Sequence, residues 1–185
     1  MTQPITVVRY HTRALHDQLE NCALNRKLMA PDVTQSIYTQ WLQGMAGFYQ
    51  TIDQALQPWR DHEQLGAYLP RVEIEYLQQD KAYWQLPEYN NQQPQLIQDY
   101  YQALGLLYVV EGAHFGARVI HKHIAKHLAL TSSTGLALLT YSQQHPKAYW
   151  QHLLTLINAA QDEPNIQSIT QGGCLGFEWA YQCLS

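Results

Sequence analysis

Apolar residues recur along this chain at helical spacing, and the pattern predicts a protein built from helices. The clearest case runs from Pro31 to Pro58, with a proline at each end. Its apolar residues recur every three or four positions, as on the buried face of a helix: Ile37, Trp41, Leu42, Met45, Phe48, Tyr49, Ile52 and Leu56. Pro58 should end this helix, because proline lacks the amide hydrogen that a helix interior needs.

The same reading extends over the rest of the chain. A first helix is predicted from Thr6 to about Leu28. Beyond the helix between Pro31 and Pro58, helices or helical turns are predicted at 59–70, 72–84, 95–128, 145–161 and 165–184. The helix at 95–128 should be interrupted over 112–116, a polar loop should cover 86–94, and residues 131–134 should form a turn and a helix cap. Strand signals are weak. We therefore expect one all-α domain over 1–185, with seven or eight helices.

Composition narrows the class of protein. A chain of 185 residues with 46% hydrophobic residues can bury a sizeable core. A net charge of -4 argues against a nucleic-acid binder. Cys22, Cys174 and Cys183 form no C-x-x-C pair, so neither a zinc site nor a disulfide framework is expected. With no secretory signal and no apolar run of about 18 residues, we expect a cytoplasmic protein without a membrane partner.

Two segments carry candidate chemistry. In the first helix, Arg9, His16 and Glu20 fall on one side, two turns and then one turn apart. A ligating imidazole usually donates its second N–H to a carboxylate, a carbonyl or water, and Glu20 is spaced to accept it. Arg9 suits the carboxylate of a ligand that lies along the helix. Taken alone, His16 would more often be an ordinary surface histidine.

The second segment is 112–117. Two pairs of small residues, Gly112-Ala113 and Gly116-Ala117, lie on either side of His114 and Phe115. Glycine inside a helix costs about 1 kcal/mol relative to alanine. Two glycines one turn apart therefore indicate either close packing of another helix or close approach of a flat ligand to the backbone.

Other histidines invite metal-binding interpretations. Glu111 and His114 have the E-x-x-H spacing of helical di-iron sites, but no second E-x-x-H occurs in the chain. His123 and His127 are one turn apart, yet a solvated basic helix end explains them better. Three more are expected near helix ends or on polar faces, in contact with solvent: His62, His145 and His152.

The two segments together resemble the heme oxygenase family, most closely its bacterial biliverdin-forming branch associated with bacteriophytochromes. Residues 11–21 are similar to the family's proximal helix and 108–120 to its distal helix. The resemblance implies a multi-helical bundle with heme b between the proximal N-terminal helix and a kinked distal helix. It assigns His16 as the axial iron ligand and Glu20 as its partner. It also implies that Arg9 contacts a propionate. The late-helix basic cluster of animal-type members is not evident around 150–154, and Arg118 would substitute for it if it points inward.

The same resemblance gives the distal residues and the reaction. Gly112, Ala113 and Gly116 would face the bound oxygen, with Phe115 beside the heme. The enzyme would cleave heme to biliverdin, iron and carbon monoxide, using O2 and electrons from an external reductase or ferredoxin. A bacteriophytochrome would be a candidate acceptor of the biliverdin. Animal-type members carry an aspartate at the position of Ala113, so here an ordered water would have to deliver the proton.

Two alternatives stay open at the level of the sequence. The first is a non-catalytic heme-binding or heme-sensing protein on the same fold, in which His114 would compete as a second axial ligand. The second is a non-heme di-iron enzyme of similar helical architecture.

Overall fold

The computed structural model describes residues 3–89 and 94–185 and consists of helices and loops in those ranges. No strand occurs in either range, which confirms the all-α prediction. Part of the loop predicted at 86–94 lies outside the described residues. The helices, in chain order, are α1 (Pro4–Glu20), α2 (Ala23–Leu28), α3 (Gln35–Ala55), α4 (Arg71–Trp84), α5 (Tyr100–Leu128), α6 (Ala137–Gln144), α7 (Lys147–Asn158) and α8 (Glu163–Leu184), with short 3-10 helices at Gln57–Trp59 and Gly66–Tyr68.

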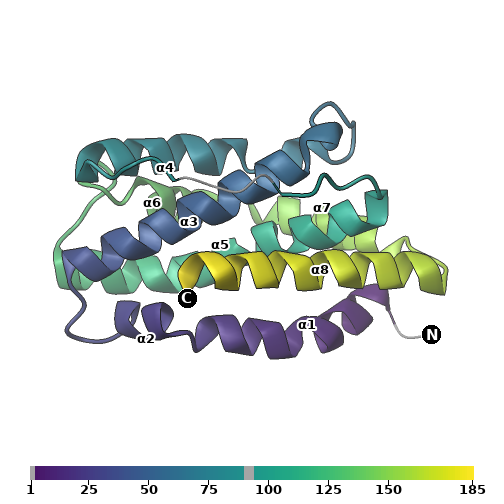
Figure 1. Cartoon of the computed structure of the whole chain (residues 1–185), viewed down its shortest axis with the longest axis horizontal. Coiled ribbons are helices and arrows are strands. Elements are labelled where there is room, and N and C mark those ends of the chain that lie inside the picture. The colour runs from purple at the N-terminus through teal and green to yellow at the C-terminus, as the bar shows by residue number, and fades with distance from the viewer. Residues whose placement is uncertain (1–2, 90–93) are drawn as a thin grey trace.

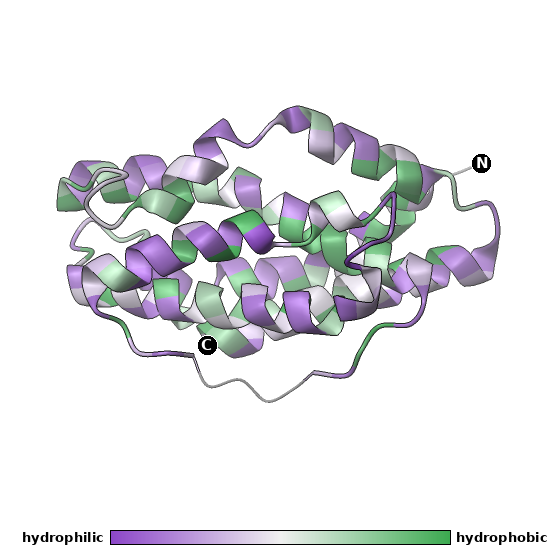
Figure 2. Cartoon of the chain, turned by 90° about the horizontal axis from the view of Figure 1, so that it is seen from above, coloured by the Kyte–Doolittle hydropathy of each residue, from purple (hydrophilic) through white to green (hydrophobic). Residues whose placement is uncertain are grey.

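The core is organised around α5 and α8, which lie side by side (Figure 1). Glycine makes this close approach possible. A Cβ added to Gly105 would collide with the backbone of Ile169 and Gly173, and one added to Gly172 would collide with the carbonyl of Gln102. The remaining helices surround this pair. Figure 2 shows short hydrophobic and hydrophilic bands alternating along the helices, as expected when each helix buries one face.

Helix α5 is long and apolar enough to cross a membrane by length and composition alone, but it is mostly buried inside the bundle. A helix surrounded by other helices must be apolar around most of its circumference. The apolar character of α5 is therefore that of a helix in the core of the bundle.

The first predicted helix is wrong in one respect, because it divides into α1 and α2 at Asn21 and Cys22. Cys22 adopts an extended backbone with φ -62° and ψ 157°. Two asparagine side chains add to the backbone hydrogen bonds at the end of α1: Asn21 donates to Asp17 O at 2.7 Å and Asn25 donates to Leu19 O at 2.8 Å, and both carbonyls also accept from backbone amides. The Asn25 contact joins α2 to the end of α1 across the break and stabilises it.

The predicted interruption of the distal helix is also wrong. Helix α5 begins at Tyr100, where Asp99 caps it by accepting from Tyr101 N at 2.7 Å and Gln102 N at 3.1 Å. It then continues without a break through 112–116. The helical cost of two glycines, about 1 kcal/mol each, is small enough for tertiary contacts to outweigh it.

Candidate functional site

A cavity of about 660 Å³ lies between α1 and α2 on one side and α5 on the other. This volume falls in the usual range for small-molecule sites, roughly 300–1,000 Å³. Its lining is mainly apolar, with His16, Glu20 and Asn25 as its polar residues besides Tyr108 and the tryptophans. The remaining lining residues are Leu19, Leu28, Met29, Trp41, Met45, Phe48, Tyr108, Val109, Gly112, Ala113, Phe115, Gly116, Ala117, Val119, Ile120, Trp150, Phe177, Ala180 and Leu184.

The structure brings His16 and the predicted distal glycines to the same cavity, from α1 and α5 respectively. The His16 side chain is 49% exposed, so its ring is open to a ligand. The Phe177 ring of α8 meets it edge-on, with centroids 5.6 Å apart. An accessible imidazole held by one aromatic contact is suited to bind a metal centre that enters the cavity.

Two carboxylates flank the His16 ring. Glu20 Oε1 lies 3.7 Å from Nε2, and Asp17 Oδ1 lies 3.7 Å from Nδ1. Both distances are too long for a hydrogen bond. Glu20 is therefore beside the ring, as its spacing predicted. In this rotamer, Asp17 is nearer the nitrogen that would stay free if Nε2 bound a metal, and a ring flip would exchange the two.

The glycines of α5 form the opposite wall, and here the structure separates the two explanations left open above. A Cβ added to Gly116 would meet nothing within 4 Å, and one added to Gly112 would meet only Trp150 Cζ3 at 4.0 Å. No neighbouring helix among the described residues fills either space. Gly112 and Gly116 therefore keep the cavity open, in contrast to Gly105, where the backbone of α8 packs directly on the glycine.

Aromatic rings close one side of the cavity. Trp150 of α7 contacts the Tyr108 ring at 5.5 Å and the Phe115 ring at 5.3 Å, and Tyr108 in turn contacts Phe177 at 6.5 Å. Phe115 lines the cavity, as predicted for a ligand contact, and is 41% exposed. Ala113 also lines it and offers a methyl group, with no acid or hydroxyl.

The two arginines predicted to bind carboxylates do not line the cavity. Arg9 is exposed on α1, two turns from His16. Arg118 points toward α6, where its Nε donates to Ser142 O at 3.1 Å and its Nη2 donates to His145 O at 2.8 Å. A cation at a helix carboxyl end is favourable because carbonyls lack partners there. The inward orientation that the propionate role of Arg118 requires is not found.

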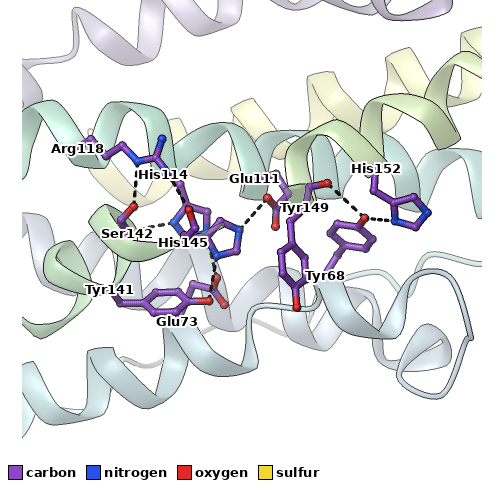
Figure 3. A network of polar contacts seen from close by, with 10 residues as sticks. All are labelled: Tyr68, Glu73, Glu111, His114, Arg118, Tyr141, Ser142, His145, Tyr149 and His152. Carbon is purple, nitrogen blue, oxygen red and sulfur yellow. Dashed lines mark hydrogen bonds and ion pairs between the residues drawn. The ribbon is translucent and has the colours of Figure 1, made fainter. Parts of the chain in front are cut away.

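His114 is likewise directed away from the cavity, so its suggested role as a second axial ligand is wrong. It is 1% exposed, and both ring nitrogens have partners: Ser142 Oγ at 3.0 Å and Glu73 Oε1 at 3.1 Å. His145 was expected in contact with solvent, but it is buried and lies 3.0 Å from Glu111 Oε2. Figure 3 shows these groups between α5 and α4, beside α6. Desolvation first, and then the nearby Glu73 and Glu111, raise the pKa of Tyr49 well above its ordinary value.

This buried cluster contains enough histidine and glutamate to suggest a metal site, with Glu73, His114 and His145 as the compact set. The ring geometry argues against it. The His114 and His145 rings are stacked with centroids 3.9 Å apart and planes only 16° from parallel. A ligating nitrogen directs its lone pair within the ring plane, and two nearly parallel planes do not converge on one ion. The di-iron alternative therefore has no support from this arrangement.

One polar atom of the cavity wall has no partner among the described residues. Asn25 Oδ1 is shielded from solvent and accepts no hydrogen bond there, while its amide nitrogen is committed to Leu19 O. A buried carbonyl oxygen without a donor is costly, but this one is shielded from solvent and is not reached from the cavity. The unfilled space over Gly116 is what indicates a cavity suited to an occupant. An apolar, flat ligand with a metal centre fits a wall of glycine facing an open imidazole.

Sequence patterns alone did not reveal several residues of the site. Trp150, Tyr108 and Phe177 come from three different helices, and nothing in their spacing shows that they meet. The Glu73–His114 and Glu111–His145 pairs join positions 41 and 34 residues apart. Only the E-x-x-H spacing gave a signal that Glu111 and His114 belong together.

Comparisons with known proteins agree with this geometry. Residues 5–180 match the family model described as heme oxygenase. The chain also resembles solved heme oxygenases from Neisseria meningitidis (20% identity, TM-score 0.73, 100% of this chain and 91% of that one) and Leptospira interrogans (16%, 0.75, 100% and 99%). A third is heme oxygenase-2 from Synechocystis sp. PCC 6803 in complex with heme and NO (20%, 0.72, 99% and 84%). No curated protein matches this chain.

Proposed function

The chain belongs to the heme oxygenase family, and from this premise we propose that it opens heme b oxidatively to biliverdin, iron and carbon monoxide. One observation carries the proposal: His16 and the open glycine face of α5 line the same cavity from opposite walls. The bound heme would supply the oxygen chemistry, as cofactors generally do, while the protein supplies binding, orientation and electrostatics.

In this proposal His16 would hold the iron through one ring nitrogen, and the carboxylate beside the other nitrogen, Asp17 or Glu20 according to the ring orientation, would orient the ring. Such partners fix the tautomer of a metal-bound histidine and increase its basicity. The open space beside Gly112 and Gly116 would leave room for a diatomic ligand at the iron. The Tyr108 and Trp150 rings would shield this part of the cavity from bulk water. Since Ala113 has no proton to give, water has to deliver it.

Two parts of the proposal lie outside the cavity. Arg9 is exposed two turns from His16, within reach of a carboxylate that leaves the cavity along α1. Arg118 is not included, because its guanidinium is committed to α6. Electrons would come from a separate ferredoxin or reductase, and a bacteriophytochrome is a candidate acceptor for the product in the cytoplasm.

The test is a single-turnover experiment with purified protein and one equivalent of hemin, reduced in air in the presence of catalase. Loss of the Soret band with growth of a broad red absorption, together with carbon monoxide trapped by deoxymyoglobin, is the expected result. Failure to take up hemin would refute the proposal.

Ala113 supports a second candidate function, a heme-binding protein that does not degrade heme, because the cavity lacks an acid on its distal wall. The same experiment separates the two. A Soret band that shifts on reduction but does not decay would establish the heme binder.

A further inference from the structure

The segment 112–116 of α5 is in contact with neighbouring helices mainly on the face that points away from the cavity. Its cavity face contacts little, because the space beside Gly116 is empty within 4 Å and Gly112 has only a distant contact with Trp150. Glycine also makes the backbone more flexible than any other residue would. A segment that must sit at a fixed distance from a ligand therefore has to be held from its other face.

The other face is held by ionisable groups from two neighbouring helices (Figure 3). His114, at the middle of the segment, contacts Glu73 of α4 and Ser142 of α6. Glu111, just before it, contacts His145 at the end of α6. Arg118, just after it, donates to two carbonyls of α6, and the Gln143 side chain donates to Arg118 O at 3.0 Å.

The central contact is a buried hydrogen bond. Ser142 Oγ lies 3.0 Å from His114 Nδ1 and 3.2 Å from Leu138 O, so its single hydrogen serves one of the two contacts. The contact of 3.1 Å between His114 Nε2 and Glu73 Oε1 contains a proton, because two lone pairs at that distance would repel. With Glu73 only 5% exposed, loss of either partner would leave a buried polar group unsatisfied.

We infer that Glu73, Glu111 and His145 are positioning residues, which clamp the glycine segment of α5 to α4 and α6 and so fix its distance from the heme. The inference rests on the proposed function for its consequence, but the clamp itself is a property of the protein without heme. None of the three residues lines the cavity, so their effect on a ligand would pass through the backbone of α5.

Hydrogen exchange in the heme-free protein tests the clamp directly. Glu73 lies on α4, so its substitution leaves the sequence of α5 unchanged. Glu73→Ala should accelerate amide exchange over 112–118 about tenfold, because His114 loses a buried hydrogen-bond partner. Glu73→Gln keeps an acceptor and should stay within about twofold of the parent. Glu75→Ala, at an exposed position on the same helix, is the matched control.

If exchange in Glu73→Ala rises equally over 112–118 and over α8, the residue is merely structural and the clamp is refuted; unchanged exchange refutes it as well. If Glu73→Ala does not fold, His145→Ala removes the contact between α6 and Glu111, and its amide exchange is compared over the same two segments.

The consequence for the ligand is tested with the ferrous CO complex, which forms without turnover. Glu73→Ala should change the CO dissociation rate about tenfold, with Glu73→Gln restoring the parent rate and Glu75→Ala not affecting it. Identical CO dissociation rates in the parent and the three variants would show that the clamp has no effect on a ligand bound at the heme. A parent that takes up no hemin would refute the proposed function, while the exchange experiment would still decide the clamp.

Discussion

At the scale of single residues, position 116 illustrates what an unoccupied neighbourhood implies for a glycine. An alanine methyl group at Gly116 would touch nothing within 4 Å, and alanine favours the helix. Gly116→Ala should therefore raise the free energy of unfolding of the heme-free protein by about 0.5–1 kcal/mol. Urea unfolding measures this, and a loss of stability would contradict the structure.

Gly105→Ala is the matched comparison within the same helix. Its methyl group would collide with the backbone of Ile169 and Gly173. We expect it to lower the free energy of unfolding by about 1–3 kcal/mol, because backbone atoms cannot move aside as side chains do. Two identical substitutions in one helix should thus change stability in opposite directions.

The prediction of an iron ligand at this scale concerns His16. His16→Ala should abolish or strongly shift the Soret band of the hemin complex, because the cavity lining contains no other histidine. His11→Ala removes an exposed histidine from the same helix and should leave the spectrum unchanged. A normal spectrum in the His16 variant would move the axial ligand to another residue.

Larger side chains at the distal wall should act on the ligand and not on the fold. Gly116→Leu would project into the cavity, where the open space can accept it. The variant should fold, with weakened hemin binding or blocked CO binding to the ferrous complex. Normal binding of both would show that the space over Gly116 is not used.

The sequence singled out residues that the structure brings to one cavity, but not the aromatic and buried groups around them. His16, Glu20, Gly112 and Gly116 line the cavity, and spacing together with the family resemblance drew attention to them, while their roles stay predictions. Arg118 was misassigned, because spacing does not tell which neighbour a long side chain reaches, and α6 offered it unsatisfied carbonyls. His145 was misplaced for a similar reason, since burial beside Glu111 is a tertiary property.

At the scale of elements, α6 depends on a buried residue of another helix. Asp80 of α4 is fully buried and accepts from Ala137 N at 2.7 Å and Leu138 N at 2.9 Å, so it caps the start of α6. Burial raises the pKa of Asp80 from 3.8 to about 6, against the lowering effect of the two amides. Since α6 supplies Ser142 and His145 to the cluster behind α5, the cap contributes indirectly to the distal wall.

The raised pKa of Asp80 has a definite sign for stability. The folded protein holds this proton more tightly than the unfolded chain does, so the contribution is greatest at low pH and is lost as pH rises through about 6. Relative to Asp80→Asn, the parent should gain about 1 kcal/mol of unfolding free energy from about pH 7 to about pH 5. The variant lacks the titrating group and therefore serves as the control for the parent. A difference that stays constant with pH would contradict the assignment.

Some helix boundaries were predictable from the sequence and others were not. The long apolar stripe of α3 and the helix at α8 were predicted nearly as found. The split between α1 and α2 was missed, because it involves the Asn25 side chain, which donates to a carbonyl across the break. The interruption of α5 was predicted from glycine propensity, which the packing of α5 against its neighbours outweighs.

At the scale of the whole molecule, the cavity makes stability depend on ligand. A ligand that binds only the folded protein adds about 2.7 kcal/mol at a hundred times its Kd. For a chain of this size, one kcal/mol corresponds to roughly 2–4 °C in Tm. Hemin should therefore raise Tm by about 5–10 °C, and this increase should be absent in His16→Ala. Equal shifts in both proteins would indicate adsorption of hemin outside the cavity.

The single all-α bundle was predictable because helical periodicity repeats over nearly the whole chain. The arrangement of the helices was not, since the pairing of α5 with α8 depends on interlocking glycines that leave no periodic signal. The family resemblance implied only a bundle in which the first helix and the helix at 95–128 form a ligand site, and it did not predict the pairing of α5 with α8.

The empty space beside Gly116 also bears on how this family diverges. If alanine there stabilises the heme-free fold, only the need for a ligand keeps glycine in place. Mutational drift in a descendant that has abandoned heme should then replace Gly116 early, whereas Gly105 should persist because the bundle itself requires it. The identities of these two positions would separate descendants still under selection for heme from those that inherit only the scaffold.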